Sequence, residues 1–462
     1  MKKGSIIFVL VLLLASVSIA QEKLSLDDCV AIGLQSNTLL QNAQHQLDMA
    51  KSQRMNSWQG LLPRLTASAT LPSRTYSSAG TRIQDTPIID PATNEVIRWE
   101  QQEKPFSAQT YKNFSGNVTF SQNIWDNGAS LRQVQRGFST VNSNKSSLNF
   151  TAVNTIQLIK QRYFELIRAL KQREVFEQNY ELAQNQFSNA EVMYSVGTVP
   201  QNDVLRTQAS VGDSRIGLID QDIVIENAKQ QLNLAMGRDI NTPMDVVLEN
   251  NTQVNYNLSL DNLTSQALSR NPNLMRLEED IKGSAYDVKI AKAARYPSIG
   301  GYAQYSRRNP LLERIYDDMT LNYSFSVGLQ FNLTLFDGFQ IHNNVQRAVS
   351  TMKMNEENFE DGKRTTISNV KMAYLRVMAY RNKIEINETM VEAAEENYRL
   401  ADERYKIGSG TLLEMIDARS NLVRVRFQLV QLQYDAKIAE AQLEAAVGAM
   451  DQKYLDMIEN KN

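Results

Sequence analysis

The stretch FSVGLQFNLTL at residues 325–335 alternates apolar and polar side chains without a break. A period of two over eleven residues is the pattern of a β-strand with one apolar and one polar face. Its length fits the roughly nine to eleven residues with which a tilted strand crosses a bilayer. We therefore expect the apolar face of this strand to meet lipid through Val327, Leu329, Phe331 and Leu333.

The sequence also contains a tandem duplication. Pro63 recurs as Pro297, and the segment Leu24–Asp27 recurs at residues 258–261, both at an offset of 234 positions. Farther along the chain the offset becomes 211 positions, which carries Gly197 onto Gly408 and Tyr163 onto Tyr374. One insertion of 23 residues in the first copy, between Pro63 and Trp125, accounts for both offsets.

The N-terminal residues predict the compartment, and the duplication predicts the limits of the two repeats. Residues 1–20 have a basic start, an apolar run and a small-residue site at Ser18–Ala20, which is the pattern of a secretory signal peptide. The first repeat is expected at 21–240 and the second, with a C-terminal tail, at 241–462. The single cysteine, Cys29, has no partner for an intrachain disulfide and is expected to pack as a small buried hydrophobe.

Each copy has the same predicted order of elements: a helix, two strands, a very long helix and a shorter helix. Residues 128–195 contain no proline and keep helical spacing, and such a helix would be about 100 Å long. This length points to a coiled coil or a helical tube. Helices are expected at 26–61, 128–195, 202–236, 260–295 and 411–447, and loops at about 72–115 and about 307–324.

Four strands per chain cannot close a barrel, because closed barrels begin at about eight strands. Open sheet edges inside lipid would leave backbone groups unpaired, so several subunits must share one transmembrane β-barrel. The sequence does not decide between two subunits and three. The fold class expected is thus a mixed α and β membrane protein, with long antiparallel helical hairpins forming a periplasmic α-barrel and a shared β-barrel, and its shape is that of a duct.

The residues quoted so far resemble the TolC-like outer membrane efflux proteins, also called outer membrane factors. The resemblance rests on the helix start at Leu24–Asp28, the turns Tyr194–Gly197 and Tyr405–Gly408, and the segment Leu412–Ala418. It covers nearly the whole mature chain. It implies a homotrimer in the cell outer membrane with a long periplasmic extension, acting as the passive exit channel of a tripartite efflux pump or a type I secretion system. The partners implied are a periplasmic adaptor protein, a proton-driven or ATP-driven inner-membrane transporter and outer-membrane lipid.

The same resemblance assigns roles to residues near the two turns. Glu414 and Asp417 lie three positions apart on one helix face, and in the family the matching positions form an acidic gate ring at the periplasmic entrance. Glu414 has a competing interpretation as half of a capping box with Thr411. Tyr405 and Asp203 match two members of the family's gate lock, whereas the basic member is Gly410 here. The turns expected to face the adaptor consist of Val196, Gly197, Thr198, Ile407, Gly408 and Ser409.

Other classes of function find little support in the sequence. The two histidines, His45 and His342, occupy non-equivalent positions, and no metal-binding spacing or phosphate-binding loop is present, so we expect no enzyme, cofactor or bound metal. The charge is balanced, with 49 basic and 51 acidic residues, which gives no reason to expect nucleic acid. The alternative is a periplasmic coiled-coil structural protein without a pore, which would have no use for the amphipathic strand at 325–335. The exported substrate stays open among drugs, metals and proteins.

Overall fold

The computed structural model describes residues 23–248, 254, 259–311, 314, 317, 320–448 and 454. The expected signal segment, residues 1–20, lies outside the described residues. The chain divides into two compact units. The helical unit comprises Met1–Met49, Asn142–Glu279 and Glu357–Asn462, and the strand unit comprises Ala50–Val141 and Asp280–Glu356.

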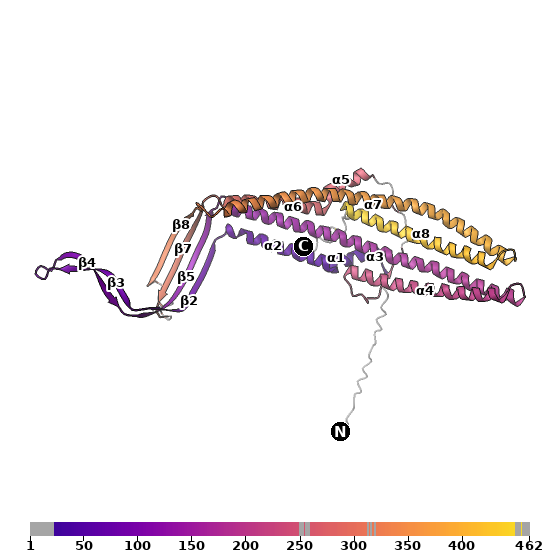
Figure 1. Cartoon of the computed structure of the whole chain (residues 1–462), viewed down its shortest axis with the longest axis horizontal. Helices are drawn as coiled ribbons and strands as arrows, with labels where there is room; N and C mark the ends of the chain where they lie inside the picture. The colour runs from indigo at the N-terminus through magenta and orange to yellow at the C-terminus, as the bar shows by residue number, and fades with distance from the viewer. Residues whose placement is uncertain are drawn as a thin grey trace, which may run out of the picture. The chain divides into compact units, whose positions relative to one another are not determined.

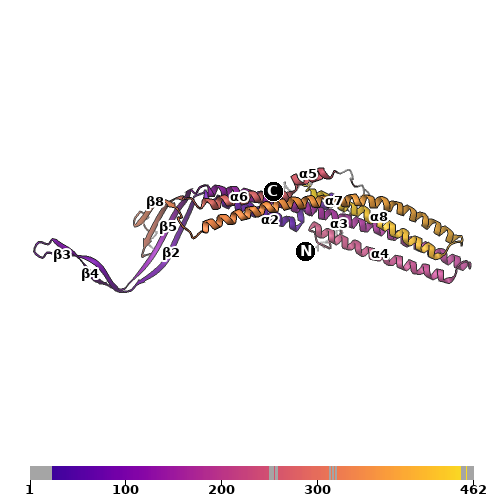
Figure 2. The same cartoon turned by 45° about the horizontal axis from the view of Figure 1, so that its top comes forward.

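The greater part of two helical hairpins lies in the helical unit. The first consists of α3 (Ala129–Ser195) and α4 (Gln201–Met236), and the second of α7 (Gln340–Lys406) and α8 (Leu412–Val447). The long helix has 67 residues and the short helix 36 residues in both copies, which confirms the duplication and the expected helix lengths. In each hairpin the two helices lie side by side (Figure 1 and Figure 2). No helix in the described part of the chain is both long enough and apolar enough to cross a bilayer.

The prediction of one continuous helix at the start of each copy is wrong. The first copy has α1 (Leu26–Ser36) and α2 (Thr38–Ser57), and the second has α5 (Leu260–Arg270) and α6 (Pro272–Ala293). The breaks fall at the equivalent residues Asn37 and Asn271, whose backbones are extended. An asparagine side chain can cap a new helix turn and so compete with the continuing helix.

The two asparagines also hold each copy together. The Asn37 side-chain oxygen accepts a hydrogen bond from the backbone N–H of Leu39, and its amide donates to the Ala235 carbonyl at 2.9 Å. The Asn271 amide donates in the same way to the Ala446 carbonyl at 3.3 Å. Ala235 and Ala446 are equivalent in the duplication, so the same side chain joins the short helix pair to the second hairpin helix twice.

The core of the helical unit follows the periodic stripe expected on α3. Ile159, Tyr163 and Ile167 are fully buried, and the Tyr163 hydroxyl donates to the Val247 carbonyl at 2.9 Å. Cys29 is fully buried as well, in agreement with its expected role as a packed hydrophobe. Next to this core, β1 (Lys23–Leu24) pairs in parallel with β6 (Asp245–Val246) and ties the start of the first repeat to the segment that follows α4.

The strand unit contains a four-stranded antiparallel sheet in the order β2-β5-β7-β8. Its strands are β2 (Arg64–Ser77), β5 (Gln109–Trp125), β7 (Ser298–Asn309) and β8 (Tyr323–Asn332). The β5–β7 pairing joins the two copies. β8 ends three residues earlier than expected, because β7 begins only after Pro297 and offers no partner beyond the pair Ser298–Asn332. Leu333 therefore lies outside the strand.

The loop expected at about 72–115 is wrong. β2 and β5 extend into this segment, and β3 (Gly80–Ile89) pairs with β4 (Val96–Phe106) as an antiparallel hairpin that turns near Asn94. The proline, serine, threonine and asparagine content suggested a loop, but the segment also carries isoleucine, valine and tryptophan, and these residues and its threonines favour strands. Most of the insertion in the first copy is thus a regular hairpin.

Three glycine-to-alanine substitutions distinguish the effect of a left-handed backbone on stability from the effect of close packing. Gly237 caps α4 with φ of 75°, and an added Cβ would lie 2.5 Å from the Ser36 carbonyl oxygen. Gly197 has a similar φ of 76° but open space around it, whereas Gly212 is an exposed residue inside α4. We expect Gly197→Ala to lower the free energy of unfolding by about 1–2 kcal/mol, because alanine is disfavoured in the left-handed conformation. Gly237→Ala should lower it distinctly more, because the added Cβ also meets Ser36. Gly212→Ala should raise it by up to about 1 kcal/mol.

Thermal unfolding of the purified protein, followed by circular dichroism, provides the measurement. The midpoint temperature should be highest for Gly212→Ala, followed by the wild type and then Gly197→Ala, and lowest for Gly237→Ala. Equal midpoints for Gly237→Ala and Gly197→Ala would contradict the close packing of α4 on the break between α1 and α2.

Candidate functional site

The turns that close the two helical hairpins have the same backbone structure. The N–H groups of Thr198 and Ser409 donate to the carbonyls of Met193 and Arg404, and each glycine N–H donates three residues back. This is the Schellman arrangement, which requires a left-handed residue, and Gly197 and Gly408 have φ of 76° and 74°. The interpretation of both glycines as helix ends is confirmed. The hydrophobic residue before each glycine is among the most exposed apolar side chains described: Val196 at 69% and Ile407 at 79%.

Residues of both turns line one groove of about 750 Å³ in the helical unit. Tyr405 is buried in its wall and packs with Leu412 and Met415, and Met193 of α3 packs against this cluster. The two hairpin ends are therefore held together by an apolar cluster, with Asp203 and other polar groups around it.

The structure brings the two gate-lock candidates close together. Burial raises the pKa of the Tyr405 hydroxyl above its usual value, and the negative charge of Asp203 raises this pKa further. The hydroxyl is buried and has no hydrogen-bond partner among the described residues. At the third position of the lock, a Cβ added to Gly410 would lie 3.0 Å from the Arg404 Cβ, so a basic side chain would require the turn to shift.

Glu414 takes part in a complete capping box at the start of α8. The Thr411 hydroxyl accepts from the Glu414 N–H at 3.2 Å, and the Glu414 carboxylate accepts from the Thr411 N–H at 3.4 Å. Glu414 and Asp417 are both exposed in the single chain, and Asp417 has no hydrogen-bond or ion-pair partner among the described residues. The helix-capping interpretation of Glu414 is confirmed, and the acidic ring stays a prediction. Within the described residues, no cluster of three or more His, Cys, Asp or Glu could hold a metal ion.

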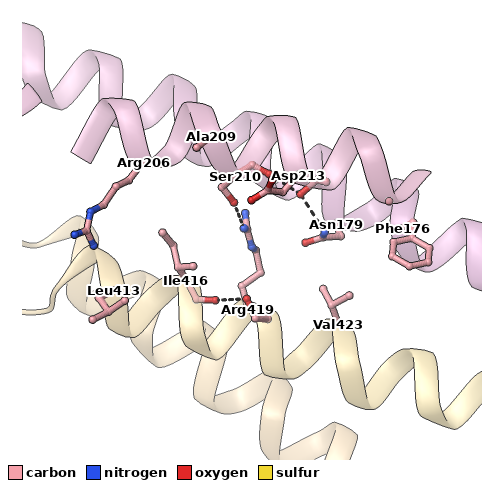
Figure 3. Close-up of a pocket in the computed structure, with 13 residues that line it drawn as sticks. Phe176, Asn179, Arg206, Ala209, Ser210, Asp213, Leu413, Ile416, Arg419 and Val423 are labelled. Carbon is pink, nitrogen blue, oxygen red and sulfur yellow. Dashed lines mark hydrogen bonds between the residues drawn. The ribbon is translucent and has the colours of Figure 1, made fainter. Parts of the chain in front are cut away.

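A polar network near the turns was missed by the sequence reasoning. Arg419 on α8 donates to Gln186 on α3 and to Ser210 on α4, and Gln186 donates to the Tyr398 hydroxyl on α7. Figure 3 shows Arg419 reaching from α8 towards Ser210. We call these four residues the Arg419 network. The sequence did carry a signal, because Arg419 follows Met415 at helical spacing and so puts a charge on the buried face of α8.

The pairing register of the four-stranded sheet gathers its apolar residues on one face. Directly paired residues share a face in an antiparallel sheet, and Ala67 pairs with Val118, Val118 with Tyr305 and Tyr305 with Phe325. The opposite face carries mostly serine, threonine, asparagine, glutamine and glycine, together with Arg64 and Tyr302. The first face contains Leu65, Ala67, Val118, Phe120, Ile299, Ala303, Tyr305, Phe325, Val327, Leu329 and Phe331, and towards its ends it also carries Gln122 and Arg307. Val327 and Leu329 are 73% and 74% exposed.

The model of the family described as outer membrane efflux protein matches residues 32–238 and 263–449. This chain belongs to the outer membrane efflux protein family. The two matches correspond to the two copies recognised in the sequence. Membership places the chain in the outer membrane, among channels with a periplasmic extension, and the relatives described below are transport and secretion proteins rather than enzymes.

Curated relatives of this outer membrane efflux protein are distant. The outer membrane efflux protein BepC of Brucella suis is 30% identical over 36% of this chain and 35% of the relative. The alkaline protease secretion protein AprF of Pseudomonas aeruginosa is 24% identical over 65% of this chain and 61% of the relative. The chain thus matches about a third to three fifths of the length of these two proteins.

Solved structures match over more of the chain. The CmeC outer membrane channel of Campylobacter jejuni aligns with a TM-score of 0.75 at 18% identity, over 94% of this chain and 89% of that one. The channel protein CusC aligns with a TM-score of 0.77 at 16% identity, over 93% of both chains. At these identities the likeness shows the fold.

The capping box at the start of α8 can be tested apart from any role in gating. We expect Thr411→Ala to destabilise the first turn of α8 by about 1 kcal/mol, because the Glu414 N–H loses its acceptor. Deuterium uptake of a peptide covering 411–416, measured by mass spectrometry, should become about fivefold faster. Ser420→Ala, on the exposed face of the same helix, is the control and should leave this uptake unchanged. Unchanged uptake in Thr411→Ala would show that the cap does not hold this turn.

Proposed function

We propose that this protein is a homotrimeric exit channel in the outer membrane, a passive duct that is gated at the turns of its helical hairpins. It serves a tripartite efflux pump or a type I secretion system. The relatives support both forms of export, since one is named an efflux protein and another an alkaline protease secretion protein.

The observation that carries the proposal is the amphipathic four-stranded sheet. Its apolar face is exposed in the single chain, and its outer strands β2 and β8 each have a partner on one side only within this sheet. Backbone groups left unpaired in lipid cost several kcal/mol each, so the outer strands need further partners. Pairing of β2 from one chain with β8 from the next supplies them, and three chains give a closed barrel of about twelve strands.

The alternative of a periplasmic coiled-coil protein without a pore leaves this sheet unexplained. A water-soluble coiled coil would expose Val327, Leu329 and Phe331 to solvent, where a continuous apolar patch favours aggregation. Lipid against the same face removes this cost. The channel is therefore the better account of the strand unit.

The turns of the helical hairpins are the surface proposed for the periplasmic adaptor. Val196 and Ile407 are exposed next to the left-handed glycines, so each turn presents an apolar side chain to a partner. Energy for export would come from a proton-driven or ATP-driven transporter of the inner membrane. In the trimer, Glu414 and Asp417 from three chains would form the acidic gate ring, with Tyr405 and Asp203 beside it.

The lipid-facing assignment is tested by one charge on each face of β8. Leu329→Arg should destabilise the membrane-inserted protein by about 2–4 kcal/mol, because it places a charge in lipid. The control Gln330→Arg adds the same charge to the polar face and should be tolerated. The amount of folded trimer recovered from the outer membrane is the measurement, and loss of trimer in Gln330→Arg with normal recovery of Leu329→Arg would reverse the assignment.

The acidic ring is tested by the double variant Glu414→Gln with Asp417→Asn. The glutamine keeps an oxygen that can accept from Thr411, so the helix cap survives while the charges are removed. Single-channel recordings should show that the variant loses the cation preference and the cation block of the wild type. The control Glu191→Gln with Asp220→Asn removes two exposed charges elsewhere on the first hairpin and should keep both properties. Unchanged selectivity in the first variant would leave Glu414 as a helix cap alone.

A further inference from the structure

The Arg419 network crosses between the two helical hairpins at every bond. The Arg419 guanidinium donates to the Gln186 side-chain oxygen at 2.6 Å and also to the Ser210 hydroxyl, both on the first hairpin. The Gln186 amide in turn donates to the Tyr398 hydroxyl of the second hairpin at 3.1 Å. The four residues lie 10 to 13 positions from Gly197 or Gly408, so they form one layer about 15–20 Å along the helices from the turns.

The charge at the centre of this layer is buried and has no ion-pair partner within the described part of the chain, although Asp213 lines the same pocket. Arg419 is only 4% exposed, its Nε has no hydrogen-bond partner, and no carboxylate of the described residues forms an ion pair with it. Burial lowers the pKa of Arg419, but a guanidinium stays protonated in proteins, so the charge persists. Removing a guanidinium from water is costly, and neutral hydrogen-bond partners offset only part of that cost.

The duplication shows that this charge is not a requirement of the repeated fold. The residue equivalent to Arg419 in the first copy is Gln208, which is exposed on α4. The positions equivalent to Gln186 and Ser210 in the second copy are Asn397 and Asn421. The layer is therefore built once, with its charge on α8, the helix that also carries Glu414 and Asp417.

We propose that Arg419 is a positioning residue that sets how readily the two hairpins separate. While Gln186 and Ser210 accept its hydrogen bonds, it holds the second hairpin against the first. Without those acceptors, the buried charge favours separation, because moving the hairpins apart returns the guanidinium to water. This inference rests on the proposed channel function. The Arg419 network would connect the two hairpins in a chain that has Gly410 at the basic position of the family's gate lock.

Removing an acceptor without removing the charge gives the first test. Gln186→Leu keeps the size of the side chain and leaves Arg419 with Ser210 as its remaining partner. In planar bilayers without an adaptor, we expect the full-length trimer to show an open fraction about tenfold or more above the wild type, from the cost of an unsatisfied buried charge. The control Gln184→Leu changes an exposed glutamine of the same helix and should behave as the wild type. Equal open fractions for the two variants would overturn the proposal.

A second substitution separates the charge from packing. Adding Arg419→Met to Gln186→Leu removes the group that favours separation, so the open fraction should return towards the wild-type value. If the double variant stays as open as Gln186→Leu, lost packing explains the opening and the proposal fails. If Gln186→Leu does not assemble, Ser210→Ala replaces it with the same expected direction and the same reversal by Arg419→Met.

Hairpin separation can also be measured without any channel current. Spin labels at Arg206→Cys and Leu413→Cys, one on each hairpin, report the distance between α4 and α8 in trimers diluted with unlabelled chains. Native Cys29 stays unlabelled, because burial raises its pKa to about 12. A longer distance in Gln186→Leu, reversed by Arg419→Met, supports the inference even if no variant conducts, in which case only the channel function fails. An unchanged distance overturns the inference even if the wild type conducts.

Discussion

Unpaired backbone groups at the edges of the four-stranded sheet constrain everything else about the strand unit. β2 and β8 each leave one row of N–H and C=O groups without a partner in this sheet, while the face between them is apolar and exposed. Water could satisfy the edges but not the face, and lipid could cover the face but not the edges. The two demands are met together only when further strands pair with both edges inside a membrane. In the proposed channel, neighbouring chains supply these further strands.

In the helical unit, the corresponding constraint is a close contact. The glycine that ends the second hairpin helix packs against the asparagine at which the first helix of the copy is interrupted. Gly237 sits against Ser36 and Asn37, and Gly448 sits against Asn271 and Pro272, at distances that leave no room for a Cβ. The asparagine amide then bonds the last turn of the second hairpin helix. Because the same contact occurs in both copies, the base of each hairpin is built alike.

The ends of the hairpins are not alike, and this difference bears on the proposed gate. Both turns have the same Schellman backbone, yet Glu414 and Asp417 correspond to Asp203 and Arg206 in the first copy. Arg419 likewise corresponds to an exposed glutamine. Identical backbones at the turns therefore carry different charges, and the second hairpin holds both the acidic pair and the buried guanidinium. A conformational change at the turns can then act on one hairpin more than on the other.

The duplication, the long helices, the four sheet strands and the left-handed glycines at the turns could all be predicted from the sequence. Each of these depends on local patterns: repeated residues, a period of two or 3.6, and the conformational freedom of glycine. The sequence also pointed to the capping box of Glu414, since Thr411 and Glu414 have the spacing that such a cap requires.

Contacts between segments far apart in the chain account for the features that could not be predicted. The first helix of each copy breaks at Asn37 or Asn271, where the side chain also donates to a carbonyl far along the chain, and the polar insertion forms a hairpin through the pairing of β3 with β4. The register that aligns Val118, Tyr305 and Phe325 on one face depends on pairing between strands almost 200 residues apart. Helical spacing places Arg419 on the buried face of α8, but its acceptors on α3 and α4 come from the fold. A hydrogen-bond partner far along the chain leaves no periodic trace in the sequence, which is why these features appear only once the chain is folded.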